Sequence, residues 1–229
     1  MPALPVLKGV SVLDLLLPQR CLVCGRGGAQ LCEACRDGLG RLEPPLCARC
    51  GAPVAWPVAR CRECTGRRLA FASARAAVPY DPSVRALVAA WKERGLRRLA
   101  EHAAAVVAER LAAPDVHAVT FVPSDPDRRL ERGHNPAERL ARGLGAYWSL
   151  ECRPLLERTR RGRQRGSTQE ERRANVRGAF RATTGVPTRV LLVDDVYTTG
   201  ATASAAASAL RSAGARQVDV VTFARALRL

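Results

Sequence analysis

The sequence predicts an α/β protein in which a mostly parallel sheet, flanked by helices, follows a small cysteine-rich module. Four Cys-x-x-Cys pairs lie within residues 21–64. Beyond residue 70, strand-like and helix-like segments alternate, which is typical of parallel sheets covered by helices. Residues 189–210 form the clearest single unit, a buried strand followed by a turn of small residues and a helix. We therefore expect two structural parts of unequal size.

The chain of 229 residues is strongly basic. Its 37 Lys and Arg outnumber 21 Asp and Glu, so the formal net charge is +16. Such an excess favours polyanionic partners. All of these basic residues except Lys8 and Lys92 are arginine, a bias that codon composition can produce without selection for function. Aromatic residues make up only 4% and do not cluster, which argues against a nucleic-acid surface built by base stacking.

The first residues are apolar but interrupted. Lys8, Asp14 and three prolines break residues 2–18, and the stretch is too short to span a bilayer. It also lacks the Ala-x-Ala cleavage site of a signal peptide. We expect a short docked helix within residues 1–17, with contact to a membrane surface as the alternative. The expected location is the cytoplasm.

The cysteines predict zinc. Each Cys-x-x-Cys pair can place two thiolates on one tight turn, and two turns complete a tetrahedral Cys₄ site. Four pairs therefore predict two zinc ions within residues 18–68, both structural, because a Cys₄ site leaves no open coordination position. Disulfides are the competing interpretation, which the strict spacing and the missing signal peptide disfavour. The pairs are Cys21/Cys24, Cys32/Cys35, Cys47/Cys50 and Cys61/Cys64.

The residues after the pairs bear on which turns share an ion. Glycine follows Cys24 and Cys50, whereas Arg follows Cys35 and Thr follows Cys64. Glycine lets a turn tighten, so that backbone N–H groups can point at the sulfurs. This alternation favours two sequential sites, residues 21–35 and 47–64. Crossed pairings remain open.

The chain beyond residue 70 alternates between strand and helix patterns. A continuous apolar run predicts a buried strand, and polar residues at its end predict a helix cap. Ser83 is the expected cap of the first helix and Asn135 that of the third. The expected elements are a strand over 71–78, helices over 83–94 and 96–112, a strand over 117–122 and a helix over 135–148.

Residues 189–210 carry a pattern with chemical meaning. A strand over 190–193 is expected to end at Asp194 and Asp195, and a turn over 198–200 leads into an uncharged helix. Hydroxyls and backbone N–H groups at a helix N-terminus attract phosphate. Two adjacent carboxylates can hold vicinal hydroxyls or the waters of a Mg²⁺ ion. The combination suits a ribose 5-phosphate.

Residues 190–202, Val-Leu-Leu-Val-Asp-Asp-Val-Tyr-Thr-Thr-Gly-Ala-Thr, resemble the phosphoribosyl pyrophosphate loop of type I phosphoribosyltransferases. The cysteine pairs, Tyr80 and the segments at 91–95, 129–135 and 171–180 resemble the ComF family of competence-associated phosphoribosyltransferase-like proteins. This resemblance covers essentially the full chain. The chain departs from it at His134 and Pro136, where the family usually has Phe and Gln.

The resemblance implies a type I phosphoribosyltransferase fold over residues 70–229 and phosphoribosyl pyrophosphate, with Mg²⁺, as the ligand. It implies that the ribose hydroxyls are bound by the candidate catalytic residues Asp194 and Asp195. The implied 5-phosphate loop comprises Thr198, Thr199, Gly200, Ala201 and Thr202. The implied pyrophosphate-binding residues are Ser124, Arg128 and Arg129, and those of a flexible loop are Arg160, Arg161, Arg163 and Gln164.

The basic segment over 158–181 admits three interpretations. It carries nine arginines and resembles a mobile flap that closes over the pyrophosphate. A contact with nucleic acid and a solvated flap without a specific role are the alternatives.

Three functions remain open at this point. The first is an enzyme that transfers the phosphoribosyl group to a nitrogen nucleophile that the sequence does not identify. The second, implied by the resemblance, is a component of DNA uptake that handles single-stranded DNA with a helicase partner. The third is a regulator that binds the metabolite without chemistry.

Overall fold

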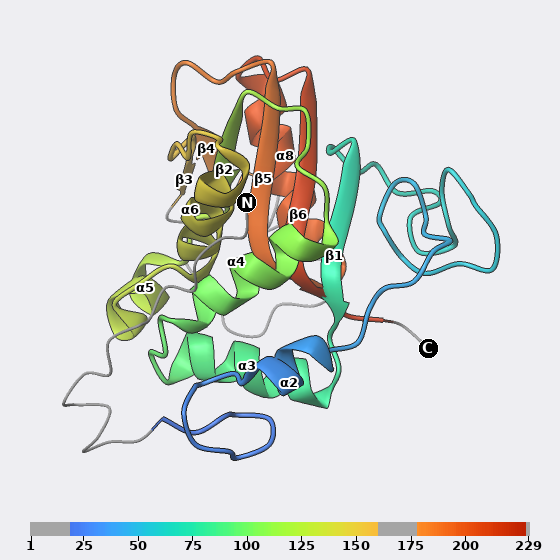
Figure 1. Ribbon diagram of the computed structural model, residues 1–229. Coiled ribbons are helices and arrows are strands. Elements are labelled where there is room, and N and C mark those ends of the chain that lie inside the picture. Colours follow the sequence, from blue (N-terminus) through green and yellow to red (C-terminus); the bar gives the residue numbers. More distant parts are fainter. Residues whose placement is uncertain (1–18, 160–177, 228–229) are drawn as a thin grey trace, which may run out of the picture.

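The computed structural model describes residues 19–159 and 178–227, and Figure 1 shows their arrangement. The helix expected within residues 1–17 lies outside this part of the chain. One parallel sheet forms the centre, with helices on both faces. The two cysteine-rich segments lie apart from each other, the first at the bottom of the view and the second at its right. The predicted fold class, an α/β sheet with an N-terminal double zinc ribbon, is confirmed.

The central sheet has the strand order β1-β6-β5-β2, and every neighbouring pair is parallel. Its interior is apolar on both faces, as expected for parallel strands covered by helices. In β5, Leu191 and Val193 pack into one core cluster, whereas Val190 and Leu192 pack into the other. The strands are β1 (Ser73–Pro79), β2 (Ala118–Phe121), β5 (Arg189–Tyr197) and β6 (Gln217–Arg225).

Helices cover both faces of the sheet. One core cluster contains residues of α3 (Pro82–Glu93), α4 (Leu99–Arg110) and α6 (Pro136–Trp148), and the other contains residues of α8 (Ala201–Ser212). Two short helices lie outside this layering, α2 (Glu33–Asp37) in the first cysteine-rich segment and α5 (Pro126–Arg132) after β2. The strands β3 (Leu156–Arg158) and β4 (Phe180–Ala182) form a separate antiparallel pair on the α8 side.

Two local predictions were wrong. The strand does not end at Asp194 and Asp195 but continues to Tyr197, because β6 runs alongside and pairs with it as far as the register Tyr197↔Arg225. Ser83 does not cap α3. The residue before Pro82, Asp81, has an extended backbone, and its carboxylate accepts a hydrogen bond from the Val84 N–H at 2.8 Å.

The other elements expected after residue 70 are confirmed within a few residues, and Asn135 caps α6 as predicted. Among the described residues after residue 70, four elements were not predicted: β3, β4, β6 and α5. Within residues 19–159 and 178–227, no helix is long and apolar enough to cross a membrane.

Candidate functional site

The eight paired cysteines form two groups of four, and the grouping is the sequential one. Cys21, Cys24, Cys32 and Cys35 form the first, and Cys47, Cys50, Cys61 and Cys64 form the second. Within each group the sulfur atoms all lie within 4.8 Å of one another.

The distances between the sulfur atoms fit four thiolates arranged as a tetrahedron around one ion. In the second group, the Cys47 and Cys64 Sγ atoms are 3.7 Å apart and those of Cys50 and Cys61 are 3.5 Å apart. Four thiolates about 2.3 Å from a zinc ion would be roughly 3.8 Å apart. Both groups therefore suit structural zinc, and neither has a position left for a substrate. We name them the first ribbon (residues 20–40) and the second ribbon (residues 45–68).

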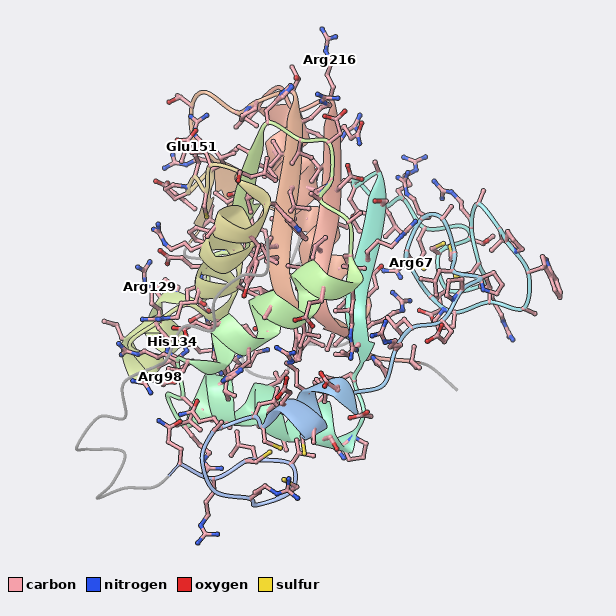
Figure 2. The ribbon with its side chains drawn as sticks, in the orientation of Figure 1. Arg67, Arg98, Arg129, His134, Glu151 and Arg216 are labelled. Carbon is pink, nitrogen blue, oxygen red and sulfur yellow. The ribbon has the colours of Figure 1, made fainter. Side chains whose placement is uncertain are left out.

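The carboxyl ends of the parallel strands meet at one edge of the sheet, where ligands of α/β proteins bind. In Figure 2, Arg216 marks the opposite edge, since it precedes β6. Asp194 and Asp195 lie near the carboxyl end of β5. Lys92 reaches them from α3, and its Nζ lies 2.7 Å from Asp195 Oδ1.

Asp194 has an unusual titration. Burial raises the pKa of its carboxyl to about 7, and the neighbouring Asp195 carboxylate adds to the rise. Lys92 and Arg158 act in the opposite direction. Because Lys92 neutralises Asp195 in this arrangement, the pair carries less negative charge than two free carboxylates. Such a pair can accept hydrogen bonds from neutral hydroxyl groups.

The segment 198–202 surrounds a small polar pocket. Asp194 borders it from β5 and Thr222 from β6, while the segment itself supplies three further residues, Thr198, Gly200 and Thr202. The side chains of Thr198 and Thr199 are exposed, and α8 begins at Ala201. Backbone N–H groups at the start of this helix, together with threonine hydroxyls, form a donor-rich surface for an anion.

Gly200 is required by two features of this turn. Its φ is +71°, a left-handed conformation that favours glycine. A Cβ atom added there would lie 2.2 Å from the Tyr197 Oη. The tyrosine ring therefore lies directly against the turn, and no larger residue fits without displacing it.

The proposed pyrophosphate residues lie on and before α5. Ser124 is partly buried, whereas Arg128 and Arg129 are exposed. Arg129 forms a distant ion pair with Glu138 at 4.0 Å. No hydrogen bond or ion pair among the described residues joins either arginine to Asp194 or Asp195. Both arginines are therefore available to solvent, and Figure 2 shows Arg129 near α5 at the margin of the molecule.

The proposed flexible-loop residues Arg160, Arg161, Arg163 and Gln164 lie outside the described residues. The strands β3 and β4, which flank this segment in the chain, pair antiparallel. Arg158, at the end of β3, lies 4.0 Å from Asp125, the residue that caps α5.

Sequence reasoning assigned no individual ligand role to three residues that the fold brings to this edge, namely Lys92, Arg158 and Thr222. Lys92 did carry a signal. In a chain with 35 arginines and two lysines, a lysine is an exception, and its compact ammonium group suits a single buried carboxylate. Thr222 carried none, because its place depends on the register between β5 and β6.

Comparison with known proteins agrees with this architecture. Residues 12–65 match the family described as "Double zinc ribbon domain". Over nearly its whole length, the chain is similar to Competence protein ComFC of Streptococcus pneumoniae, with 27% identity over 96% of this chain and 99% of the relative. The resemblance to the ComF family is confirmed.

Two further relatives extend this likeness. Competence protein F of Haemophilus influenzae is 27% identical over 90% of this chain and 97% of its own. The DNA utilization protein YhgH of Salmonella typhimurium is 29% identical over 93% of this chain and 100% of its own.

The two departures from the ComF pattern are accommodated by the fold. His134 is buried, and its Nδ1 lies 2.9 Å from the carbonyl oxygen of Arg132. Pro136 occupies the first turn of α6, where its missing N–H has no helical partner to lose. Pro136 thus suits the start of α6, and His134 is held just before it with its Nε2 atom buried.

Proposed function

We propose that the protein binds phosphoribosyl pyrophosphate at the carboxyl edge of the sheet and takes part in DNA uptake or utilization. The main support for binding of phosphoribosyl pyrophosphate is the pocket bordered by Asp194, Thr222 and the segment 198–202. A carboxylate and a donor-rich helix start border this one pocket, as a sugar phosphate would require. The names of the relatives support the second half.

Each part of the ligand has a matching group. The 5-phosphate would accept hydrogen bonds from Thr198, Thr202 and backbone N–H groups at the start of α8. The ribose hydroxyls would donate to Asp194 and Asp195, whose charge Lys92 partly offsets. The pyrophosphate would extend toward Ser124 and α5, where Arg128 and Arg129 can offer bidentate contacts.

The donor set also suits Mg²⁺ brought in with the ligand. Magnesium keeps several waters and is usually held by one or two carboxylates together with substrate phosphates. Asp194 and Asp195 are oxygen donors of this kind. When bound, the ion would neutralise charge on the departing pyrophosphate. This chain's residues would orient the ribose, and transfer to an acceptor is the enzymatic form of the proposal.

The decisive experiment is isothermal titration of the zinc-loaded, full-length protein with phosphoribosyl pyrophosphate and Mg²⁺. We expect the double variant Asp194→Asn with Asp195→Asn to lose binding. A matched control is Asp115→Asn with Asp219→Asn, because both residues lie at the amino ends of the strands and the charge change is the same. Equal binding by the site variant and the wild type would disprove the site.

Single-stranded DNA tests the second half. Binding through arginines releases counterions, so affinity should fall steeply between two salt concentrations. We expect it to survive the aspartate substitutions. Phosphoribosyl pyrophosphate binding without turnover, measured across a panel of nitrogen acceptors, would favour the metabolite-sensing regulator over the enzyme.

A further inference from the structure

The second ribbon is linked to Tyr197, the residue before the segment 198–202, through a buried arginine. Arg225 is the last residue of β6, and its side chain is 1% exposed. Its guanidinium donates to the Cys50 carbonyl oxygen at 2.6 Å and to Glu63 Oε2 at 2.8 Å, and it approaches the Cys50 sulfur at 3.6 Å. A buried cation needs nearby anions. The second ribbon supplies them as a carboxylate and, with zinc bound, a thiolate.

The same guanidinium stacks on the ring of Tyr197. The Arg225 Cζ lies 4.6 Å from the centre of the Tyr197 ring, within range of a cation–π contact. Tyr197 immediately precedes the segment 198–202, and its hydroxyl lies under Gly200. Phe71 packs edge-on against the same ring, at 6.2 Å between centroids. The position of Tyr197 is therefore set from the second-ribbon side.

A second contact fixes the segment itself. Arg67, at the end of the second ribbon, donates from its guanidinium to the Thr199 carbonyl oxygen at 2.6 Å. Figure 2 shows Arg67 on the second-ribbon side of the sheet, far from Arg129 and His134. One turn into α8, the Ser204 hydroxyl accepts from the Ala70 N–H at 3.1 Å. The Thr199 carbonyl oxygen and the Ser204 hydroxyl are thus held from outside the turn, while the Ala201 N–H donates to the Thr199 hydroxyl at 3.3 Å.

We propose that the second ribbon supports the proposed 5-phosphate site. In this proposal Arg67 and Arg225 are positioning residues that hold the segment 198–202 in its ligand-binding conformation. This inference rests on the proposed function for the nature of the ligand. Among the described residues, no hydrogen bond or ion pair joins the first ribbon to this segment. The second ribbon, with its zinc ion bound, would therefore support ligand binding through direct contacts with this part of the chain.

The test compares Arg67→Ala with Arg75→Ala in the zinc-loaded, full-length protein. Arg75 is a suitable control because it also donates to a carbonyl of the second ribbon, that of Ala48 at 3.0 Å, but does not contact the segment 198–202. Two measurements are made on each variant: the affinity for phosphoribosyl pyrophosphate with Mg²⁺, and hydrogen exchange of the backbone amides of residues 198–206.

We expect Arg67→Ala to weaken binding roughly tenfold, the effect of one hydrogen bond from a charged group. Its amides over 198–206 should exchange several-fold faster, while Arg75→Ala stays within about twofold of wild type in both measurements. Arg67→Lys should restore part of the loss. Arg225→Lys keeps the positive charge but loses the planar guanidinium with its several donors. It provides a second test, at the contact with Tyr197.

The outcomes separate the two proposals. Unchanged affinity and unchanged exchange in Arg67→Ala would overturn the positioning role. Faster exchange limited to this segment, in a protein whose wild type does not bind phosphoribosyl pyrophosphate, would support the positioning role and reject the proposed ligand. Equal effects of Arg67→Ala and Arg75→Ala would show that any disturbance of the ribbon suffices, and would also reject the specific role of Arg67.

Discussion

The two ribbons share one ligand pattern but are integrated into the protein differently. In the first, only Cys21 is buried and Cys24 is exposed, whereas in the second Cys47, Cys50 and Cys64 are all buried. The first packs Cys21, Leu31 and Leu39 against the helices of one sheet face. The second packs on the opposite core and adds the contacts of Arg225 and Arg67. Two four-cysteine sites of the same kind are therefore packed into the protein to different depths and on opposite core clusters.

The largest expected difference between the ribbons is in the effect of losing one ligand. Cys50→Ser should cost roughly 4 kcal/mol in the free energy of unfolding, because it weakens the zinc site and leaves Arg225 buried without one of its partners. Cys24→Ser, at the exposed site, should cost about 1 kcal/mol in the unfolding of the sheet. Zinc content and denaturant unfolding measure both, and each variant should retain one ion. Equal losses of stability would contradict the comparison.

Replacement of one arginine at each ribbon should give the next largest effect. Arg225→Met removes a buried cation from Glu63 and Cys50 and should cost about 3 kcal/mol. Arg36→Met, at the first ribbon, breaks an ion pair with Glu109 at 3.4 Å that is largely exposed, so it should cost less than about 1 kcal/mol. Urea unfolding of the two variants checks the difference, and a cost at Arg36 as large as at Arg225 would disprove it.

The glycines that follow Cys24 and Cys50 provide a smaller comparison. Both have positive φ, +75° at Gly25 and +70° at Gly51. A Cβ atom at Gly51 would lie 2.4 Å from the Ala74 carbonyl oxygen, whereas at Gly25 nothing lies within 4 Å. Gly25→Ala should therefore cost only the backbone strain, about 1 kcal/mol, and Gly51→Ala at least about 2 kcal/mol. Thermal unfolding measures both costs. A smaller loss of stability from Gly51→Ala than from Gly25→Ala would show that the backbone of β1 shifts to make room for the added methyl group.

The smallest expected effect is a change in the free energy of unfolding with pH. This change adds to the effect of acid on the ribbons, because acid also releases zinc. The pKa of Asp194 is raised to about 7 in the folded protein, so its ionisation lowers stability as pH rises from about 4 through 7. Asp194→Asn should stabilise the protein by about 1 kcal/mol more at pH 8 than at pH 5. Urea unfolding at the two pH values checks this, and equal stabilisation at pH 5 and pH 8 would contradict it.

Much of the fold could be predicted from the sequence because its signals are local. The apolar run before Asp194, the cap at Asn135 and the glycines of the metal turns each act within a few residues. The equally apolar residues of β6 were not recognised as a strand. The ladder between β5 and β6 extends β5 to Tyr197. There Tyr197 pairs with Arg225, which lies twenty-eight residues further along the chain.

For the candidate site, the sequence indicated the groups that can bind a ligand but not those that hold them in place. Asp194 and the threonines belong to one continuous segment, so their proximity follows from chain connectivity. Lys92 and Thr222 come from separate elements, and only the packing of α3 and the register of β6 bring them to the same edge.

The sequence by itself determined that the paired cysteines form two metal sites, because two tight Cys-x-x-Cys turns complete one tetrahedral site. It favoured the sequential grouping of these turns, which the tertiary structure then decided. It also determined the alternation of strands and helices through the periodicity of its apolar residues. Only the tertiary structure decided that the two ribbons lie in different environments. That difference depends on Arg225 and Arg67, whose partners Cys50 and Thr199 are 175 and 132 residues away in the chain. A contact over such separations depends on the packing of the whole sheet, since no local pattern specifies where a long side chain finds its partner.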